Sequence, residues 1–266
     1  MSRQGSYGRI LERIFFARYS EGVREVPFEI EDLVRAAESL GLERPRNVPD
    51  IPYSMRYRGN APESLLATEP EEESWIIRGR GRGRYSFVLA PRFEITPNKM
   101  LSETKIPDAT PGIVSKYALG DEQSLLAKLR YNRLIDVFTG VACYPLQSHL
   151  RSYVPQMGQV ETDDIYVGVD RRGSHYVFPV QAKGGRDKQG VVQIEQDFAL
   201  CADKFPSLIC RPIGAQFMEE DLIALFEFEE SESGITLSSE KHYGLVPPDE
   251  VTDEDLEMCQ RRGPDA

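Results

Sequence analysis

The stretch PVQAKGG, residues 179–185, has the pattern of a β-strand that ends in a glycine turn. Val180 and Ala182 are apolar and alternate with Gln181 and Lys183, so the polar pair shares one face of the strand. The two polar residues lie roughly 7 Å apart along the strand, at about 3.3 Å per residue. A strand with one apolar and one polar face needs a partner strand, and the preceding residues supply it.

The partner is the stretch QVETDDIYVGVD, residues 159–170, which is rich in β-branched and aromatic residues. The residues DRRGS separate it from HYVFPVQAKGG, and this arrangement predicts a β-hairpin. Pairing across that turn places Asp163 opposite Gln181, and Glu161 shares a face with Asp163 because side chains alternate. We therefore expect Asp163, Gln181 and Lys183 to converge at one end of the hairpin, with Glu161 in support.

Such a cluster has the donors that a hard divalent cation prefers. Mg²⁺ takes oxygen ligands, typically one or two carboxylates together with water and phosphate. The Asp163 carboxylate and the Gln181 side-chain carbonyl are ligands of this kind, and Lys183 can hold a water for in-line attack on a phosphodiester. The metal, Mg²⁺ or Mn²⁺, would lower the pKa of that water and neutralise the developing charge. The alternative is that Asp163 is a turn residue and Lys183 a solvated strand end.

An acid on one strand followed by Gln-Ala-Lys on the next resembles the PD-(D/E)XK nuclease superfamily, which has the restriction-endonuclease-like fold, in a Q-x-K variant. The matching residues are Asp163, Gln181 and Lys183, and the resemblance covers residues 115–220. The region also resembles bacterial type II restriction endonucleases. The resemblance implies Mg²⁺-dependent hydrolysis of phosphodiester bonds in double-stranded DNA, a restriction or defence role, and a homodimer.

The same resemblance implies supporting residues on the flanking helices. Glu122 precedes the hairpin, where this fold carries a supporting acid, and Gln193 and Gln196 follow it, where some branches carry a catalytic-site glutamine. Gln181 departs from the Asp or Glu of the motif and removes one charge from the metal site. The carboxylates that could supply the missing charge are those of Glu161, Asp164 and Glu195.

The order of the expected elements predicts an α/β (α+β) fold. A helix over residues 120–140, capped by Asp121 and ended by Gly140, precedes the hairpin. A helix over residues 191–205 follows the hairpin, and the stretches SLICRPIGAQFM and DLIALFEFEE then read as two more strands. This order favours a restriction-endonuclease-like mixed sheet flanked by helices.

Residues 1–96 are expected to form a separate domain. YGRILERIFFARY and FEIEDLVRAAESLGL have the apolar spacing of amphipathic helices, and SWIIRGRGRGRYSFVLA reads as a hairpin around a glycine-rich tip. Two or three helices followed by a hairpin suggest a winged-helix-like DNA-binding domain. The remaining expected divisions are a linker or an ordered connection at 97–114, the nuclease domain at 115–248 and an acidic, mobile tail at 249–266.

The net charge of −11 argues against a polyanionic partner for the chain as a whole, but the charges are unevenly distributed along the sequence. Residues 74–93 carry five arginines and no acid, and the local potential is what a polyanion meets. Arginine matches phosphate bidentately, and glycine permits close approach of the backbone. A solvated hairpin tip and a salt-bridged helix face are the alternatives. The candidate DNA-contacting residues are Arg78, Arg80, Arg82, Arg84, Arg130 and Arg133.

Other classes of protein have little support in the sequence. No apolar run approaches the roughly 20 residues that span a membrane, and the four cysteines show neither a disulfide framework nor metal-ligand spacing. No P-loop or histidine-based metal motif occurs, and His149 is expected to be structural. We expect a cytoplasmic DNA endonuclease with reduced thiols. The alternatives are a catalytically inactive nuclease-fold protein that binds DNA or regulates, and a protein-interaction module whose acidic tail binds a basic partner.

Overall fold

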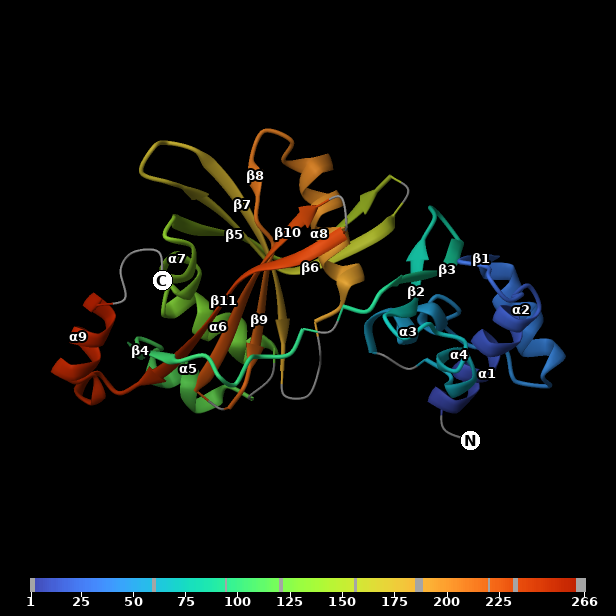
Figure 1. Ribbon diagram of the computed structural model, residues 1–266, viewed down its shortest axis with the longest axis horizontal. Coiled ribbons are helices and arrows are strands. Elements are labelled where there is room, and N and C mark those ends of the chain that lie inside the picture. Colours follow the sequence, from blue (N-terminus) through green and yellow to red (C-terminus); the bar gives the residue numbers. More distant parts are fainter. Residues whose placement is uncertain are drawn as a thin grey trace. The chain divides into compact units, whose positions relative to one another are not determined.

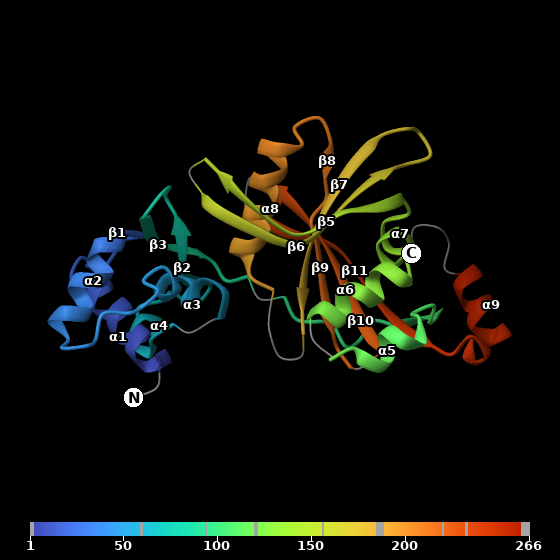
Figure 2. The ribbon, with the colours of Figure 1, turned by 180° about the vertical axis from the view of Figure 1, so that it is seen from behind.

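The structure is a computed structural model that describes residues 3–58, 61–93, 95–119, 122–155, 157–184, 189–219, 221–231 and 234–261. The chain divides into two compact units, each with its own buried apolar core. The N-terminal unit comprises Met1–Glu94, Ser152–Val160 and Gly190–Gln196. The C-terminal unit comprises Ile95–Arg151, Glu161–Gln189 and Asp197–Ala266. Figures 1 and 2 show the elements of both units from opposite sides.

The N-terminal unit combines short helices with a three-stranded antiparallel sheet of order β1-β3-β2. The two predicted amphipathic helices and the predicted hairpin around the glycine-rich tip are confirmed. The elements in chain order are α1 (Arg3–Phe16), β1 (Glu25–Glu29), α2 (Ile30–Ser39), α3 (Asp50–Arg58), α4 (Glu63–Leu66), β2 (Glu73–Gly79) and β3 (Arg84–Pro91).

Aromatic rings dominate the core of the N-terminal unit. The ring of Phe15 on α1 meets Trp75 and Phe87 edge to face, with ring centroids 4.9 and 5.3 Å apart. Edge-to-face contact at this separation is a favoured geometry for aromatic pairs. Leu33 and Ala37 of α2 are fully buried in the same core. The periodicity that predicts α2 in the sequence therefore marks the face that the helix buries.

The first turn of α2 is held by the carboxylate of Asp32. This carboxylate accepts the backbone N–H of Glu29 at 2.8 Å and contacts the guanidinium groups of Arg18 and Arg35 at 2.9 and 2.6 Å. Burial opposes the charged form, but the hydrogen bonds from Arg18, Glu29 and Arg35 outweigh it and lower the pKa of Asp32 to about 2. Because the folded-state pKa is depressed, the ionised carboxylate stabilises the fold above about pH 4 and loses that effect as the pH falls toward 2.

Replacing this carboxylate should therefore weaken the fold in a pH-dependent way. We expect Asp32→Asn to reduce the free energy of unfolding at pH 7 by about 1 kcal/mol, the usual cost of losing a cap. The difference between the two proteins should shrink as the pH is lowered from 5 to 3. Urea unfolding of both proteins across that range measures it. A difference that stays constant with pH would contradict the role of the charge.

The C-terminal unit is built on an eight-stranded mixed sheet flanked by helices, so the predicted α/β class is confirmed. The sheet has the order β4-β11-β10-β9-β7-β6-β5, with β8 beside β7. The elements are β4 (Glu103–Pro107), α5 (Gly112–Tyr117), α6 (Glu122–Tyr131), α7 (Leu134–Thr139), β5 (Ala142–Val154), β6 (Gly158–Val169), β7 (His175–Lys183), α8 (Val191–Lys204), β8 (Ile209–Cys210), β9 (Ile213–Phe217), β10 (Leu222–Ser231), β11 (Gly234–Val246) and α9 (Asp253–Arg261).

Strand β7 lies inside this sheet, with β6 antiparallel on one side and β9 parallel on the other. Its apolar side chains Val180 and Ala182 belong to the core that includes residues of α6 and α7. Its Gln181 side chain instead contacts α8 through Asp197. The predicted division of the strand into an apolar and a polar face is therefore confirmed. None of the helices in the described ranges is long and apolar enough to cross a membrane.

The prediction of a single helix over residues 120–140 is wrong in one respect. The chain forms two helices there, α6 and α7. The break lies at Arg133, whose φ of 49° is left-handed. The amide of Asn132 donates to the carbonyl of Lys128 at 3.0 Å, which ends α6, and accepts the N–H of Ala109 at 2.7 Å. The second helix ends before Gly140 as predicted. The expected cap, Asp121, lies outside the described residues.

Regular structure occurs in the expected linker and in the expected acidic tail. The expected linker at 97–114 includes β4, which pairs in parallel with β11 at the edge of the large sheet. The expected mobile tail at 249–266 includes α9 as far as residue 261, and Asp255 of that helix pairs with Lys105 at 3.0 Å. Local composition predicts neither feature, because both depend on contacts with distant parts of the chain.

Candidate active site

The β6–β7 hairpin places the predicted site residues in the expected register. Asp164 pairs with Val180 and Ile165 with Pro179, which puts Asp163 next to Gln181, as the turn predicts. Beyond the last pair, the Asp163 carboxylate accepts the backbone N–H of Ala182 at 2.8 Å. This hydrogen bond holds the Asp163 carboxylate next to Ala182, the residue between Gln181 and Lys183. The structure thus brings Asp163, Gln181 and Lys183 together.

The Asp163 carboxylate lies in a largely enclosed position. Burial raises the pKa of Asp163, while the N–H of Ala182 and the positive charge of Lys183 act to lower it, and the nearby Glu161 acts to raise it. A bound cation would stabilise the ionised form of a buried carboxyl group such as that of Asp163, because a nearby positive charge favours the negative form. The electrostatic setting of Asp163 therefore agrees with a role as a metal ligand.

Lys183 is almost buried at the end of β7, with a side chain that is 11% exposed. Its Nζ lies 3.8 Å from Oε1 of Glu122 at the start of α6. In register it stands beside Gln216 of the parallel strand β9. The Lys183 ammonium group thus lies near both Glu122 of α6 and Asp163 of β6. Glu122, which the sequence offers as a supporting acid, is brought to the cluster.

Gln181 is fully buried, and its side chain points to a residue that the sequence does not single out. Its amide nitrogen lies 3.1 and 3.0 Å from the two carboxylate oxygens of Asp197, and 3.3 Å from the backbone carbonyl of Glu161. Asp197 is itself buried, and burial raises its pKa well above the usual value, although the hydrogen bond from Gln181 acts against this. The cluster therefore has an acid behind Gln181.

Glu161 lies on the rim of the cluster beside two basic side chains of β5. Its carboxylate contacts Nε of Arg151 at 3.0 Å and Nδ1 of His149 at 4.0 Å. His149 has a left-handed backbone with φ 49°, which is uncommon for a residue other than glycine. Its Nε2 lies 2.8 Å from the side-chain nitrogen of Gln123. His149, expected to be structural from the sequence, thus lies close to the candidate site, and only its place in β5 reveals this.

Two of the carboxylates that could replace the missing charge are bound to arginines. Asp164 is fully buried and accepts Arg130 at 2.8 Å and Ser148 at 3.0 Å. Glu195 is held by Arg78 within the N-terminal unit, with a distance of 3.0 Å to Nε. Gln193 and Gln196 lie in the part of α8 that belongs to that same unit. Glu161 is the sequence candidate that remains near Gln181, and Asp197 joins it.

The candidate DNA-contacting arginines divide into paired and unpaired groups. Arg78 and Arg80 pair with Glu195 and Glu25. Arg82 and Arg84, at the tip between β2 and β3, are exposed, and neither forms an ion pair with any described residue. Of the two arginines predicted on the helix of the C-terminal unit, Arg130 holds Asp164 and Arg133 pairs with Asp136. Arg82 and Arg84 are thus the tip arginines whose charge is not matched by a carboxylate of the described residues.

The donors of the cluster suit a cation that keeps most of its water. Within the described ranges, no three His, Cys, Asp or Glu side chains lie close enough together to hold a metal ion. Mg²⁺, however, commonly takes one or two carboxylates and completes its shell with water and phosphate. Asp163 offers one carboxylate and Glu161 lies on the same side of β6, whereas Gln181 is fully buried and turns its amide nitrogen toward Asp197. A Mg²⁺ or Mn²⁺ ion at this cluster would therefore have one or two carboxylate ligands and would complete its shell with water and phosphate.

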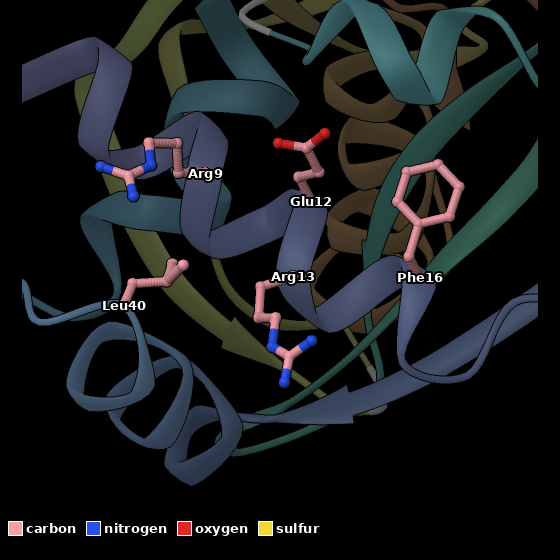
Figure 3. A pocket seen from close by; sticks show the side chains of 5 residues that line it. All are labelled: Arg9, Glu12, Arg13, Phe16 and Leu40. Atoms are coloured by element: carbon pink, nitrogen blue, oxygen red, sulfur yellow. The ribbon is translucent and has the colours of Figure 1, made fainter.

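A shallow pocket of about 240 Å³ lies elsewhere, on α1 and the end of α2 in the N-terminal unit. Its lining mixes two arginines with one acid and two apolar side chains: Arg9, Glu12, Arg13, Phe16 and Leu40 (Figure 3). It contains none of the residues of the β6–β7 cluster. The candidate site thus rests on side-chain chemistry and register.

Comparison with known proteins gives no relative: no protein-family model, no curated protein and no solved structure matches this chain.

Proposed function

We propose that the chain is a Mg²⁺-dependent endonuclease of double-stranded DNA, of the restriction or defence type. The observation that carries the proposal is the meeting of Asp163, Gln181 and Lys183 at the end of the β6–β7 hairpin, fixed by the bond from Ala182 N–H to Asp163. An acid, a neutral oxygen ligand and a lysine side by side suit phosphodiester hydrolysis assisted by a metal. The mixed sheet flanked by helices agrees with a restriction-endonuclease-like fold.

Each residue has a distinct role in this proposal. Asp163 through its carboxylate and Gln181 through its carbonyl oxygen would hold Mg²⁺ or Mn²⁺. Lys183, with its ammonium group near Glu122, would donate a hydrogen bond to the attacking water and keep it in line with the phosphorus. Bound Mg²⁺ supplies a lowered pKa for water and a positive charge for the phosphate oxygens. Glu161 and Glu122 would serve as auxiliary acids.

The N-terminal unit supports a role in holding DNA. Its order of helix, strand, three helices and hairpin, together with the sheet order β1-β3-β2, is consistent with a winged-helix-like domain. The β2–β3 tip would then be the wing, and it carries Arg82 and Arg84 in exposed positions. Arginine side chains at such a tip fit phosphate oxygens bidentately. We propose that this tip contacts the DNA backbone without reading sequence.

Removing the unpaired tip arginines should weaken DNA binding in a salt-dependent way. We expect the double variant Arg82→Ala/Arg84→Ala to give a shallower plot of the logarithm of the DNA-binding constant against the logarithm of the salt concentration. The slope should change by about 2, because each lost phosphate contact changes it by about 0.9. Arg80→Ala is the matched control, since Glu25 already holds that guanidinium. Fluorescence anisotropy with a duplex at several salt concentrations measures the slopes. A slope for the double variant equal to that of the wild type would contradict the proposed contact.

The function itself is tested with the purified full-length chain and plasmid DNA. We expect nicked and linear products with Mg²⁺ or Mn²⁺ and none with EDTA. Linear product requires cuts in both strands and is expected if two copies act as a homodimer. Absence of cleavage on plasmids of varied sequence and methylation state, under conditions where the protein binds DNA, would contradict the nuclease proposal.

A second function is favoured by one observation, the sparse set of acids near the site. Because the described residues include no group of three metal-binding side chains, a catalytically inactive nuclease-fold protein that binds or regulates through DNA is the alternative. It predicts salt-dependent DNA affinity with no cleavage at any Mg²⁺ or Mn²⁺ concentration. The plasmid assay and the salt titration together separate the two functions.

A further inference from the structure

A group of exposed charged side chains lies on the rim of the candidate site, where β5 forms one edge of the large sheet (Figure 1). The Glu161 carboxylate on β6 lies 3.0 Å from Nε of Arg151 and 4.0 Å from Nδ1 of His149. The side chains of Arg151 and His149 are 65% and 47% exposed. All three residues belong to the C-terminal unit. A ligand that reaches this rim from solvent therefore meets a guanidinium group and an imidazole ring.

The ion pair between Arg151 and Glu161 can be exchanged for another anion at little cost. Both partners are exposed to solvent in part, and ion pairs of this kind contribute little to stability. The contact involves Nε of Arg151, whereas a guanidinium group carries five N–H donors. Among the residues that the structure describes, Glu161 is the acid with which Arg151 forms an ion pair. A phosphate group fits a guanidinium bidentately and can therefore take the place of the Glu161 carboxylate.

The charges of the candidate site explain why a second cation is useful there. Asp163 lies near Glu161 and Lys183, and Lys183 lies near Glu122, so three acids surround one lysine. These acids repel the negative charge of a phosphodiester unless further cations offset them. Asp163 and Glu161 share one face of β6 and lie roughly 7 Å apart along the strand, a length that one nucleotide can span. The guanidinium of Arg151, beside Glu161, is therefore placed for a phosphate that neighbours one at Asp163.

We propose that Arg151 binds the DNA phosphate next to the one that is cut, and that Glu161 holds its guanidinium group in place in the free protein. The incoming phosphate replaces Glu161 as the partner of Arg151. The freed Glu161 carboxylate is then available as the auxiliary acid of the site. The phosphate-binding role stands on the exposed ion pair and on the excess of acids, whereas the location of this phosphate next to the cut rests on the proposed function.

The binding role of Arg151 is tested by the affinity of the full-length protein for a DNA duplex in EDTA, which excludes both metal and cleavage. We expect Arg151→Ala to weaken duplex binding about tenfold, because it removes charge-assisted hydrogen bonds to phosphate. The slope of the salt plot should become shallower by about 0.9, the change for one lost phosphate contact. Fluorescence anisotropy at several salt concentrations measures both quantities. An affinity and a slope equal to those of the wild type would overturn the proposal.

Arg172→Ala is the matched control for this variant. Arg172 lies in the turn between β6 and β7, its side chain is 77% exposed, and it pairs with Asp170 at 3.4 Å. It is thus another exposed arginine of the C-terminal unit that lies beside a carboxylate, but it belongs to the opposite end of the hairpin from Asp163. We expect Arg172→Ala to bind the duplex like the wild type. A loss equal to that of Arg151→Ala would reduce the effect to overall charge and overturn the proposal.

The holding role of Glu161 is tested by making Glu161→Gln in the wild type and in Arg151→Ala. In the wild type we expect duplex binding in EDTA to become about threefold tighter, because the exposed ion pair that competes with phosphate is weak but real. In Arg151→Ala the same substitution should have a smaller effect, since there is no guanidinium group to release. An equal gain in both backgrounds would show that Glu161 acts only by repelling DNA and would overturn its holding role.

The outcomes separate this proposal from the proposed function. Weakened binding by Arg151→Ala, together with no plasmid cleavage by the wild type, would retain Arg151 as a phosphate-binding residue and overturn the nuclease proposal. Plasmid cleavage by the wild type, together with unchanged duplex binding by Arg151→Ala, would overturn the role of Arg151 alone. A wild-type protein that binds no duplex would overturn both.

Discussion

Lys183→Ala should abolish Mg²⁺-dependent cleavage while leaving DNA binding largely intact. The Lys183 ammonium group lies beside Asp163 and Glu122 at the end of β7, where it would hold the attacking water. Loss of a group that positions or activates a nucleophile typically costs 10²–10⁴-fold in rate. Duplex affinity should change little, because the unpaired tip arginines belong to the other unit. Cleavage rates on plasmid DNA and anisotropy with a duplex measure the two properties separately.

Two controls make this result interpretable. Lys204→Ala removes an exposed lysine from the last turn of α8 and should cleave like the wild type. The melting temperature of Lys183→Ala should fall, because Lys183 is almost buried and its charge favours the ionised form of Asp163, so cleavage is compared at a temperature at which both proteins are folded. A well-folded Lys183→Ala protein that still cleaves at the wild-type rate would remove Lys183 from the site.

Gly79→Ala should cause the largest loss of stability among Gly→Ala substitutions at the described glycines of the N-terminal unit. A Cβ at Gly79 would lie 2.3 Å from the backbone carbonyl oxygen of Met157, which no side-chain rotation can relieve. Relief requires a shift of β2 or of the turn between β5 and β6, and overpacking of this kind typically costs about 1–3 kcal/mol. Urea unfolding or the melting temperature of the variant measures the effect.

Gly112→Ala is the matched control for that substitution. A Cβ at Gly112 meets no atom within 4 Å, and the residue opens the short helix α5. Its stability should be unchanged or raised by up to about 1 kcal/mol, because alanine restricts the unfolded chain. Equal stability of Gly79→Ala and the wild type would show that the close approach of β2 to Met157 does not occur.

The sequence predicts the hairpin that carries the site because its signals are local. The DRRGS turn sets the register, and alternation sets the faces, so the position of Asp163 beside Gln181 follows from counting residues. In the structure Asp170 accepts the N–H groups of Arg172 and Ser174 at 2.8 and 2.9 Å, which explains why that turn forms where it does. Local rules succeed here because each interaction involves neighbours in the chain.

The features that the sequence does not predict depend on distant contacts. The break at Arg133 follows from the side chain of Asn132, which bonds to Ala109 and Thr110 as well as to its own helix. Strand β11 is mostly polar at its start and becomes recognisable only through its pairing with β10. No pattern in the sequence connects these residues with their partners, so helix periodicity and strand alternation cannot reveal them.

Asp197 is absent from the residues that the sequence predicts, for a related reason. In VVQIEQDFALCADKF it stands among polar residues on one side of an amphipathic pattern, and such residues usually face water. The structure buries it beside Gln181 of β7, whose amide nitrogen contacts both of its carboxylate oxygens. A sequence signal exists only through the resemblance, in which Gln181 stands where the motif has an acid and another acid is expected nearby. The candidates for that acid, Glu161, Asp164 and Glu195, do not include Asp197.

The N-terminal unit is assembled from three separate pieces of chain, and this has a consequence during synthesis. Residues 152–160 and 190–196 belong to it and supply the carbonyl that faces Gly79 and the carboxylate that holds Arg78. Ribosomes add about 5–20 residues per second, so the first 94 residues wait roughly 5–20 s for the last of these pieces. The nascent unit spends that interval with Arg78 lacking its carboxylate partner, and chaperones that bind incomplete domains have that time to act on it.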